Sequence, residues 1–223
     1  MNNLTLIIPA KNEKESLPYV LKELKNKNIK THIILEKSDI KTIKSISRYK
    51  CEIIYQKKRG YGDALIQGIN SVKSKYFCIF NADGSFDPKE INLMIKKINN
   101  YNLDFIFGSR YEKNSGSEDD TLVTKTGNFI FTLIGKIFFR LNITDILYTF
   151  VLGKTKEAKK LNLIQKDFTF CVELPIKAKR KKMKLGTINC YERKRIGGKK
   201  KVNAFKDGSL ILAYMIKLFF KKV

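Results

Sequence analysis

Five short polar segments in the first half of the chain carry residue types that could bind a ligand. Each lies beside a run of apolar residues of the kind that forms a buried strand or a helix packed on one. In a parallel sheet covered by helices, ligands bind at the carboxyl ends of the strands. One polar loop beside a strand is ordinary, but five along one edge indicate a ligand site. The segments are residues 9–13 (PAKNE), 36–39 (EKSD), 59–63 (RGYGD), 81–85 (NADGS) and 108–111 (GSRY).

Charge is the second signal of function. The 223 residues include 45 Lys and Arg against 21 Asp and Glu, for a net charge of +24. Residues 177–206 alone hold thirteen basic side chains and one acid, Glu192. Such a field attracts polyanions, whether nucleic acid, anionic lipid or a phosphorylated substrate. A solvated, Lys-rich surface explains many of these lysines equally well. A nucleic-acid binder is the rival hypothesis, but no helix-turn-helix, zinc-finger or RNP-like signature supports it, so we expect no nucleic-acid partner.

The elements that position the polar segments alternate between strand and helix. This alternation, with short connections, predicts an α/β domain with a parallel sheet covered by helices. The predicted strands are residues 4–9, 31–35, 53–55, 76–80, 103–107 and 184–191, and the predicted helices are residues 17–24, 64–72, 129–139, 167–179 and one that Pro88 starts. Residues 112–121 are polar and rich in Gly and Ser, which predicts a mobile loop.

The end of the chain differs from the rest. Residues 193–206 read as a basic loop, and residues 209–220 are apolar at ten of twelve positions. That run is too short to span a bilayer, so it packs on the domain or lies in a membrane interface. We therefore expect a domain over residues 1–206 and an amphipathic, membrane-associated helix over 207–223. No transmembrane helix or signal peptide is predicted, which favours a cytoplasmic protein, peripheral at the inner face of the membrane.

Seven motifs, in order along residues 4–206, resemble those of family 2 glycosyltransferases of the GT-A fold. The polyprenyl- and dolichyl-phosphate sugar synthases are the most similar members. The motifs are IIPAKNE, RGYGDALIQGI, FNADGSFDP, FGSRY, Asp145 with Thr149 and Phe150, FTFCVELPIKA, and RIGGKKKV. The chain departs from the family's pattern at three places: EKSD at residues 36–39 replaces Asp-Asp-Gly-Ser, Asn81 replaces the first Asp of the DxD motif, and YTF at 148–150 replaces Ser-Gly-Phe.

The resemblance implies transfer of a sugar from a UDP- or GDP-linked donor to a polyprenyl phosphate or glycan-lipid acceptor. It also implies a Mg²⁺ or Mn²⁺ ion at Asp83 and Ser85, since hard cations prefer oxygen ligands. The implied donor-binding residues are Pro9, Ala10, Asn12, Glu13, Glu36, Arg59, Gly60, Asn81, Ala82 and Asp83. The implied catalytic residues are Asp83, Arg110 and Asp145. The implied acceptor- and phosphate-binding residues are Arg110, Glu173, Arg195, Lys199 and Lys201.

The charge, the apolar C-terminal run and this resemblance together give further expectations and alternatives. The partners are an anionic membrane surface and, potentially, an integral membrane protein, while the oligomeric state is left open. We expect residues 193–201 to form a mobile lid that orders over donor and acceptor phosphates. The open alternatives are transfer to a surface-glycan precursor, a catalytically inactive family member, and the basic nucleic-acid binder.

Overall fold

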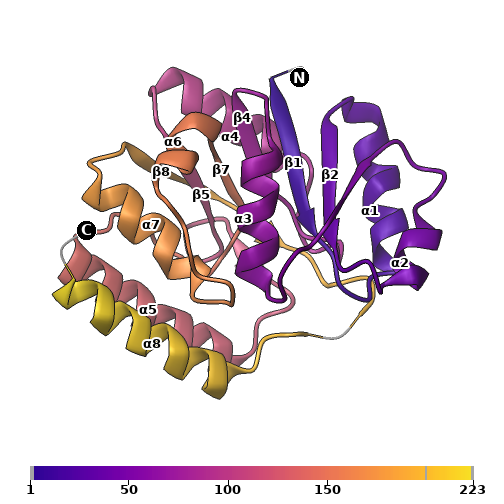
Figure 1. The fold of residues 1–223 in the computed structure, drawn as a ribbon. Helices are drawn as coiled ribbons and strands as arrows, with labels where there is room; N and C mark the ends of the chain where they lie inside the picture. The colour runs from indigo at the N-terminus through magenta and orange to yellow at the C-terminus, as the bar shows by residue number, and fades with distance from the viewer. Residues whose placement is uncertain (1–2, 199, 222–223) are drawn as a thin grey trace.

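A computed structural model gives the arrangement of residues 3–198 and 200–221. These residues form a seven-stranded sheet covered by helices on both faces (Figure 1). Every strand runs parallel to the others except β7, which is antiparallel to both of its neighbours. This mixed α/β sheet confirms the predicted fold class. In spatial order the strands are β3 (Glu52–Tyr55), β2 (Lys30–Leu35), β1 (Leu4–Pro9), β4 (Tyr76–Ile79), β7 (Val151–Lys154), β5 (Phe105–Ser109) and β8 (Leu185–Asn189).

Alternating side chains of the central strands fill two cores, one on each face of the sheet. Leu6 and Ile8 of β1 pack in the first core, and Ile7 between them packs in the second. Successive side chains of a strand point to opposite faces, so a continuous apolar run is buried on both sides. Helices α1 (Ser16–Leu24), α2 (Ile40–Ser45) and α4 (Glu90–Asn100) cover the first face, and α3 (Tyr61–Ser71), α6 (Thr155–Lys160) and α7 (Phe170–Arg180) cover the second.

Strand β7 was not predicted from the sequence. It is four residues long and enters the sheet between β4 and β5. A Cβ at Gly153 would lie 2.5 Å from a ring carbon of Phe105 and 2.8 Å from one of Phe77, so the strand needs glycine at this point. A glycine in a short run weakens the strand signal, because it has low intrinsic strand propensity.

The segment 112–121, which the sequence predicts to be a mobile loop, has partners in the structure. Residues Gly116–Ser117 (β6) pair with Tyr191–Glu192 (β9) in a small second sheet. Tyr111 donates a hydrogen bond to Asp120, and Arg195 pairs with Asp119. The segment is therefore fastened beside the basic region that follows β9.

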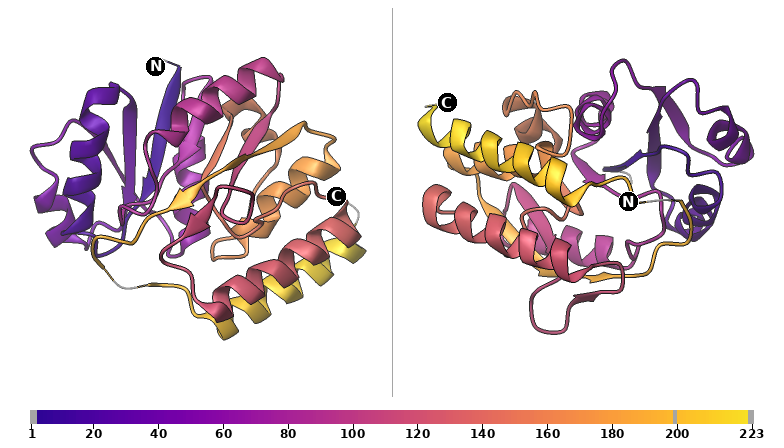
Figure 2. Two further views of the ribbon diagram at one scale, coloured as in Figure 1. Left: turned by 180° about the vertical axis from the view of Figure 1, so that it is seen from behind. Right: turned by 90° about the horizontal axis from the view of Figure 1, so that it is seen from below.

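Two long apolar helices lie side by side at one end of the molecule (Figures 1 and 2). They are α5 (Leu122–Phe139) and α8 (Ala204–Phe220). The helices run parallel, because the Cβ position of Gly208 lies near the Phe131 ring and the rings of Phe138 and Phe219 are 5.5 Å apart. The predicted C-terminal helix therefore starts at residue 204, earlier than the sequence pattern indicates. Its inner side chains, Ile211, Met215 and Leu218, belong to the second core.

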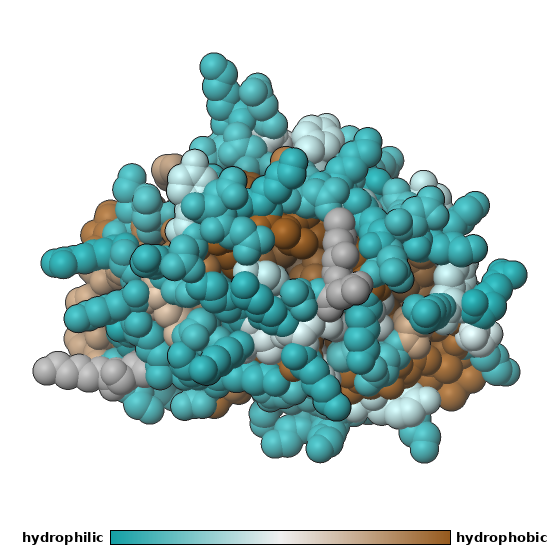
Figure 3. All heavy atoms as spheres, turned by 90° about the horizontal axis from the view of Figure 1, so that it is seen from above, coloured by the Kyte–Doolittle hydropathy of each residue, from teal (hydrophilic) through white to brown (hydrophobic). Residues whose placement is uncertain are grey.

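The outer faces of α5 and α8 are exposed and apolar. Of the helices in the described ranges, α5 alone is long and apolar enough to cross a membrane, and only 17% of it is buried within the molecule. Two polar side chains tie α5 to the domain: the buried Asn128 donates to Asp145 and accepts from the Leu147 amide, and the Thr132 hydroxyl accepts from the Ile146 amide. The opposite end of the molecule, seen from above in Figure 3, is covered mainly by hydrophilic side chains. The exposed apolar residues of the two helices are Leu122, Val123, Phe129, Ile130, Leu133, Ile137, Phe138, Phe205, Leu210, Leu212, Ile216, Phe219 and Phe220.

Candidate active site

A pocket of about 550 Å³ lies at the carboxyl ends of β1, β2, β4 and β5, where the sequence predicts a ligand site. Its walls come from the polar segments after these strands, the start of α3, the first turns of α5 and the segment 195–202. Charged side chains of both signs face it. The acids are Glu13, Glu36, Asp83, Asp119, Asp120 and Glu192, and the bases are Lys11, Arg110, Arg195, Lys200 and Lys201.

Most of the residues expected to bind the donor line this pocket. They are Pro9, Ala10, Glu13, Glu36, Gly60, Asn81, Ala82 and Asp83. Two are not among the lining residues: Asn12 and Arg59. Asn12 adopts a left-handed backbone (φ 56°), and its amide donates to Asp39 at 2.7 Å. Asp39 also caps α2, so it links the loops after β1 and β2. Arg59 reaches the pocket indirectly, through an ion pair with Glu36 at 3.7 Å.

The loop before α3 depends on glycine. Gly60 has φ 123°, a region that L side chains rarely adopt, and a Cβ there would lie 2.1 Å from the carbonyl oxygen of Lys166. The Asp63 amide donates to that same carbonyl at 3.1 Å. The absence of a side chain lets the backbone of residues 165–167 approach the start of α3. This contact positions Tyr61 in the pocket wall.

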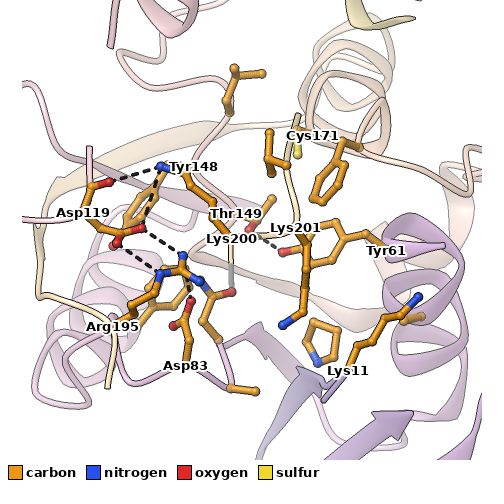
Figure 4. Close-up of a pocket in the computed structure, with 18 of the residues that line it drawn as sticks. Lys11, Tyr61, Asp83, Asp119, Tyr148, Thr149, Cys171, Arg195, Lys200 and Lys201 are labelled. Carbon is orange, nitrogen blue, oxygen red and sulfur yellow. Dashed lines mark hydrogen bonds and ion pairs between the residues drawn. The ribbon is translucent and has the colours of Figure 1, made fainter. Parts of the chain in front are cut away.

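Asp83 lies in the loop between β4 and α4. One of its carboxylate oxygens accepts hydrogen bonds from Ser85, and the other faces the pocket. Its Oδ1 accepts from the Ser85 amide at 3.1 Å and from the Ser85 hydroxyl at 2.7 Å. Its Oδ2 lies 3.5 Å from Nη2 of Arg195 (Figure 4). Ser85 is buried and is not among the lining residues, and its hydroxyl orients Asp83, while its role as a metal ligand stays a prediction.

The donor set around Asp83 fits a divalent cation that is shared with a substrate. Within the described residues, no three His, Cys, Asp or Glu side chains come together to form a complete metal cage. Asp83 offers the carboxylate oxygen that is paired with Arg195 at 3.5 Å, and Asn81 in the same wall offers an amide oxygen. Mg²⁺ is commonly bound by one or two carboxylates together with substrate phosphates and waters, rather than by an all-protein cage. The residues present suit that kind of site.

Arg110 lies in a cage of carboxylates. Its Nε and Nη2 donate to the two oxygens of Asp145 at 2.7 and 3.0 Å, and its Nη1 donates to Glu192 at 3.0 Å. Burial alone would lower the pKa of Arg110, but Asp145 and Glu192 outweigh it and hold that pKa well above its ordinary value. The guanidinium also lies over the Tyr148 ring, 4.5 Å from its centroid.

This cage changes what Arg110 and Asp145 contribute. We expected Arg110 to supply positive charge to phosphates, but its charge is already neutralised by two carboxylates. Asp145 is fully buried behind it and is not among the residues that line the pocket. The pair joins the end of β5 to α5 and to the loop before β7, since Asn128 also donates to Asp145. The geometry therefore makes Asp145 a positioning residue.

The described residues of the segment 193–202 cross the pocket and are fastened to it. Arg193 pairs with Glu23 and donates to the Phe86 carbonyl, and the Ile196 amide donates to the Asp83 carbonyl at 2.8 Å. Arg195 pairs with Asp119, and Lys201 pairs with Glu13. The residues of the expected lid lie against the pocket and are held there by internal ion pairs. Lys199, another expected phosphate-binding residue, lies outside the described residues.

The structure contradicts an acceptor-binding role for Glu173. This side chain is fully buried and accepts hydrogen bonds from the amides of Ile164 and Gln165. It also pairs with the buried Lys177 at 2.7 Å, one turn along α7. Its carboxylate therefore fixes the loop before α7, and that loop in turn contacts the start of α3.

One side of the pocket is apolar. The rings of Tyr61 and Phe168 stack with centroids 5.0 Å apart, and the Tyr61 hydroxyl bonds to that of Thr149 at 2.6 Å. Burial raises the pKa of the nearby Cys171 to about 12, so this side chain is a neutral thiol. The sequence analysis places Lys11 and Tyr61 in two of the polar segments, but it does not mark Gln56, Asp119, Asp120 or Phe168 as site residues. The available signal for Asp119 and Asp120 is the run of three acids, Glu118 to Asp120, in a chain with a large excess of basic residues.

Comparison with known proteins relates this chain to glycosyltransferases. A sequence model of the family described as "Glycosyl transferase family 2" matches residues 5–161. An uncharacterized glycosyltransferase of Mycobacterium tuberculosis is 22% identical over 208 residues, which cover 93% of each chain. An uncharacterized protein of Methanocaldococcus jannaschii is 26% identical over 149 residues, and the match spans 61% of that protein.

Another relative has a named activity. The UDP-N-acetylglucosamine–dolichyl-phosphate N-acetylglucosaminyltransferase of Methanococcus voltae is 26% identical, with 82% of each chain covered. Among solved structures, glucosyl-3-phosphoglycerate synthase from Mycobacterium tuberculosis with Mn²⁺, UDP and glucosyl-3-phosphoglycerate has a TM-score of 0.77 at 10% identity. The match covers 98% of this chain and 80% of that one.

The family match extends from β1 through α6 and so includes the loops that carry Glu13, Glu36, Asp83 and Arg110. The fold match extends over nearly the whole chain. Both agree with the order of motifs found in the sequence. This chain belongs to glycosyl transferase family 2 and is a glycosyltransferase of the GT-A fold.

Proposed function

We propose that this glycosyltransferase transfers a sugar from a UDP- or GDP-linked donor to a polyprenyl phosphate, at the cytoplasmic face of a membrane. One observation carries the proposal: the pocket opens beside two helices whose outer faces are apolar and exposed. Thr124 and Asn128 of α5 line the pocket, and Lys200 to Val202 lead from it into α8. A lipid phosphate could therefore reach the pocket while its chain stays against α5 and α8.

The donor half of the proposal rests on the pocket and its relatives. Glycosyltransferase structures of this fold have been solved with Mn²⁺ and UDP and with Mn²⁺ and UDP-glucose. In this chain the carboxylates of Glu36 and Glu13 can accept hydrogen bonds from the hydroxyl groups of the ribose and the amide groups of the base. Asp83 is the ligand for a divalent cation. A divalent cation in this position neutralises charge on a leaving nucleoside diphosphate. Asp83, acting through this cation, and the nearby lysines would hold the diphosphate in place.

The acceptor half rests on charge. In the reaction, an oxygen of the acceptor phosphate forms the bond to the anomeric carbon as the bond to the donor diphosphate breaks. That oxygen is already anionic, so no side chain has to remove a proton. The site needs cations that hold the phosphate, and Lys11, Lys200 and Lys201 face the pocket. The Methanococcus voltae relative, named for dolichyl-phosphate, supports this class of acceptor.

The membrane half rests on the surface formed by α5 and α8, which we call the α5–α8 face. Phe129 is 66% exposed, and Phe205 and Phe220 are at least 80% exposed. Basic residues flank these side chains, and the two helices carry a single acid, Asp207. Each Lys or Arg near an anionic surface contributes about 1 kcal/mol to binding. The exposed cations of the face are Lys125, Lys136, Arg140, Lys206, Lys217 and Lys221.

A donor and acceptor screen tests the reaction. Purified protein with Mn²⁺ is incubated with labelled UDP- or GDP-sugars and a short-chain polyprenyl phosphate, or with 3-phosphoglycerate in its place. We expect labelled lipid product from one donor class and none with 3-phosphoglycerate. Transfer to 3-phosphoglycerate, or to a glycan precursor alone, would refute the polyprenyl acceptor while leaving the donor assignment intact.

Vesicle binding tests the location. We expect the protein to sediment with vesicles containing anionic lipid and to be released by salt, because exposed charges are screened. Phe138→Ser with Phe219→Ser should weaken sedimentation, whereas Tyr101→Ser, an exposed aromatic at the end of α4, should not. Equal sedimentation of the double variant and the wild type would contradict the α5–α8 face as the membrane contact.

A further inference from the structure

The cations of segment 193–202 are paired with the carboxylates that the donor site needs. Nη2 of Arg195 lies 2.9 Å from Oδ2 of Asp119 and 3.5 Å from Oδ2 of Asp83, so one guanidinium bridges two acids (Figure 4). Lys200 donates to the Asp119 carbonyl at 3.1 Å, and Lys201 pairs with Glu13. Three cations thus face three carboxylates across the pocket.

The backbone of the segment is held by other contacts. The Arg193 amide donates to the Ser85 carbonyl and the Ile196 amide to the Asp83 carbonyl, both at 2.8 Å. The Arg193 guanidinium is fixed by Glu23, outside the pocket. The Arg195 side chain can therefore swing between partners without releasing the segment, since it is not what anchors the backbone.

We propose that Arg195 is an internal counter-ion that occupies the cation site at Asp83 in the free enzyme. When metal and nucleotide bind together, the Arg195 guanidinium leaves Asp83 and binds the donor diphosphate. This inference rests on the proposed donor site. Asp119, which the sequence does not mark as a site residue, is the acid that holds Arg195 in the blocking position. Arginine keeps its charge at any relevant pH, so it can leave Asp83 only by moving.

Charge balance explains why both ligands are needed. A divalent cation arriving alone at Asp83 would meet a guanidinium a few ångströms away, and like charges at that distance repel. A nucleoside diphosphate arriving alone would meet Asp83, Asp119 and Glu13. Together the two ligands add nearly equal and opposite charge, and the freed guanidinium gains a diphosphate, to which it can bind through two hydrogen bonds. Metal and nucleotide should therefore bind with positive coupling that passes through Arg195.

Calorimetry on the full chain separates this mechanism from direct metal–nucleotide contact. Mn²⁺ alone is titrated into the wild type, Arg195→Gln and Lys194→Gln, and then UDP and GDP are titrated with and without Mn²⁺. Lys194 is the matched control, because it is exposed, carries the same charge and is not a lining residue. Mn²⁺ alone should bind Arg195→Gln about twofold to fivefold more tightly than the wild type, a change expected from one partly exposed ion pair. The control should leave that affinity unchanged.

The second titration should show the opposite change in affinity. With Mn²⁺ present, the nucleotide should bind Arg195→Gln more weakly than the wild type, because the diphosphate has lost a partner. Arg195→Met, which keeps the length of the chain without its charge, repeats both measurements, and circular dichroism checks the fold of each variant. An unchanged or weaker affinity for Mn²⁺ alone in folded Arg195 variants would overturn the proposal. A wild type that binds neither nucleotide, even with Mn²⁺, would instead refute the donor site and this inference with it.

Discussion

The buried pair of Arg110 and Asp145 allows a prediction with a magnitude. Asp145 accepts hydrogen bonds from the Arg110 amide, Nε and Nη2 and from Asn128, and its side chain is fully buried. In Asp145→Asn, one acceptor oxygen becomes an NH₂ group that must face another donor, and the guanidinium loses its main counter-charge. Breaking a buried pair by changing one partner costs about 3–5 kcal/mol. That is a large share of the roughly 5–15 kcal/mol that stabilises a typical domain.

Urea unfolding followed by circular dichroism measures this cost. Glu157→Gln is the matched control, because Glu157 pairs with Lys160 on the surface of α6 at 2.8 Å. An exposed pair of this type contributes about 0.3–0.5 kcal/mol, so the control should unfold almost as the wild type does. The reasoning fails if Asp145→Asn costs no more than Glu157→Gln. That result would mean that Arg110 does not depend on Asp145 for its counter-charge.

Three further predictions concern buried groups. Glu173→Gln should lower the free energy of unfolding by about 3 kcal/mol, because Lys177 stays buried without its partner; a loss below 1 kcal/mol in urea would contradict this. Gly68→Ala should cost about 1–3 kcal/mol in the same assay, since a Cβ would lie 2.3 Å from Cγ2 of Ile7, and an unchanged midpoint would show that α3 shifts freely. Burial lowers the pKa of His32 below its ordinary value of 6.5, although Glu52 opposes the shift. As the pH falls through 6.5, the unfolded chain therefore binds more protons than the folded one. The free energy of unfolding should decrease more steeply with decreasing pH in the wild type than in His32→Gln.

The strands of the first half could be predicted closely because their signal is local. A continuous apolar run such as residues 4–9 forms a strand buried on both faces, and β1 has those bounds. The signal is weaker where a strand is short and contains glycine, as β7 does, and where pairing occurs only through a distant partner, as β6 does with β9. Such pairing is decided by tertiary packing, which residue patterns report poorly.

The candidate site shows the same division. The polar segments after the strands do meet in one pocket, as expected for a parallel sheet. The partners of Arg110 could not be predicted, because Asp145 and Glu192 lie 35 and 82 residues away from it along the chain. Glu173 fits a family motif by its letters, yet its burial gives it a structural role. Asp119 is part of a polar loop in the sequence and becomes a site residue only when Arg195 reaches it.

The central claim is that Asp83 serves a metal-dependent transfer of sugar from a nucleotide donor to a lipid phosphate. The most direct measurement is transfer of a labelled sugar to a short-chain polyprenyl phosphate by the wild type, Asp83→Asn and Asp87→Asn, each with Mn²⁺ and with EDTA. Asp87 is the control, because it lies four residues further on and does not line the pocket. We predict that EDTA abolishes wild-type transfer, that Asp83→Asn loses about a hundredfold or more with Mn²⁺ present, and that Asp87→Asn stays close to the wild type. Transfer by Asp83→Asn at the wild-type rate, or wild-type transfer that persists in EDTA, would contradict the claim.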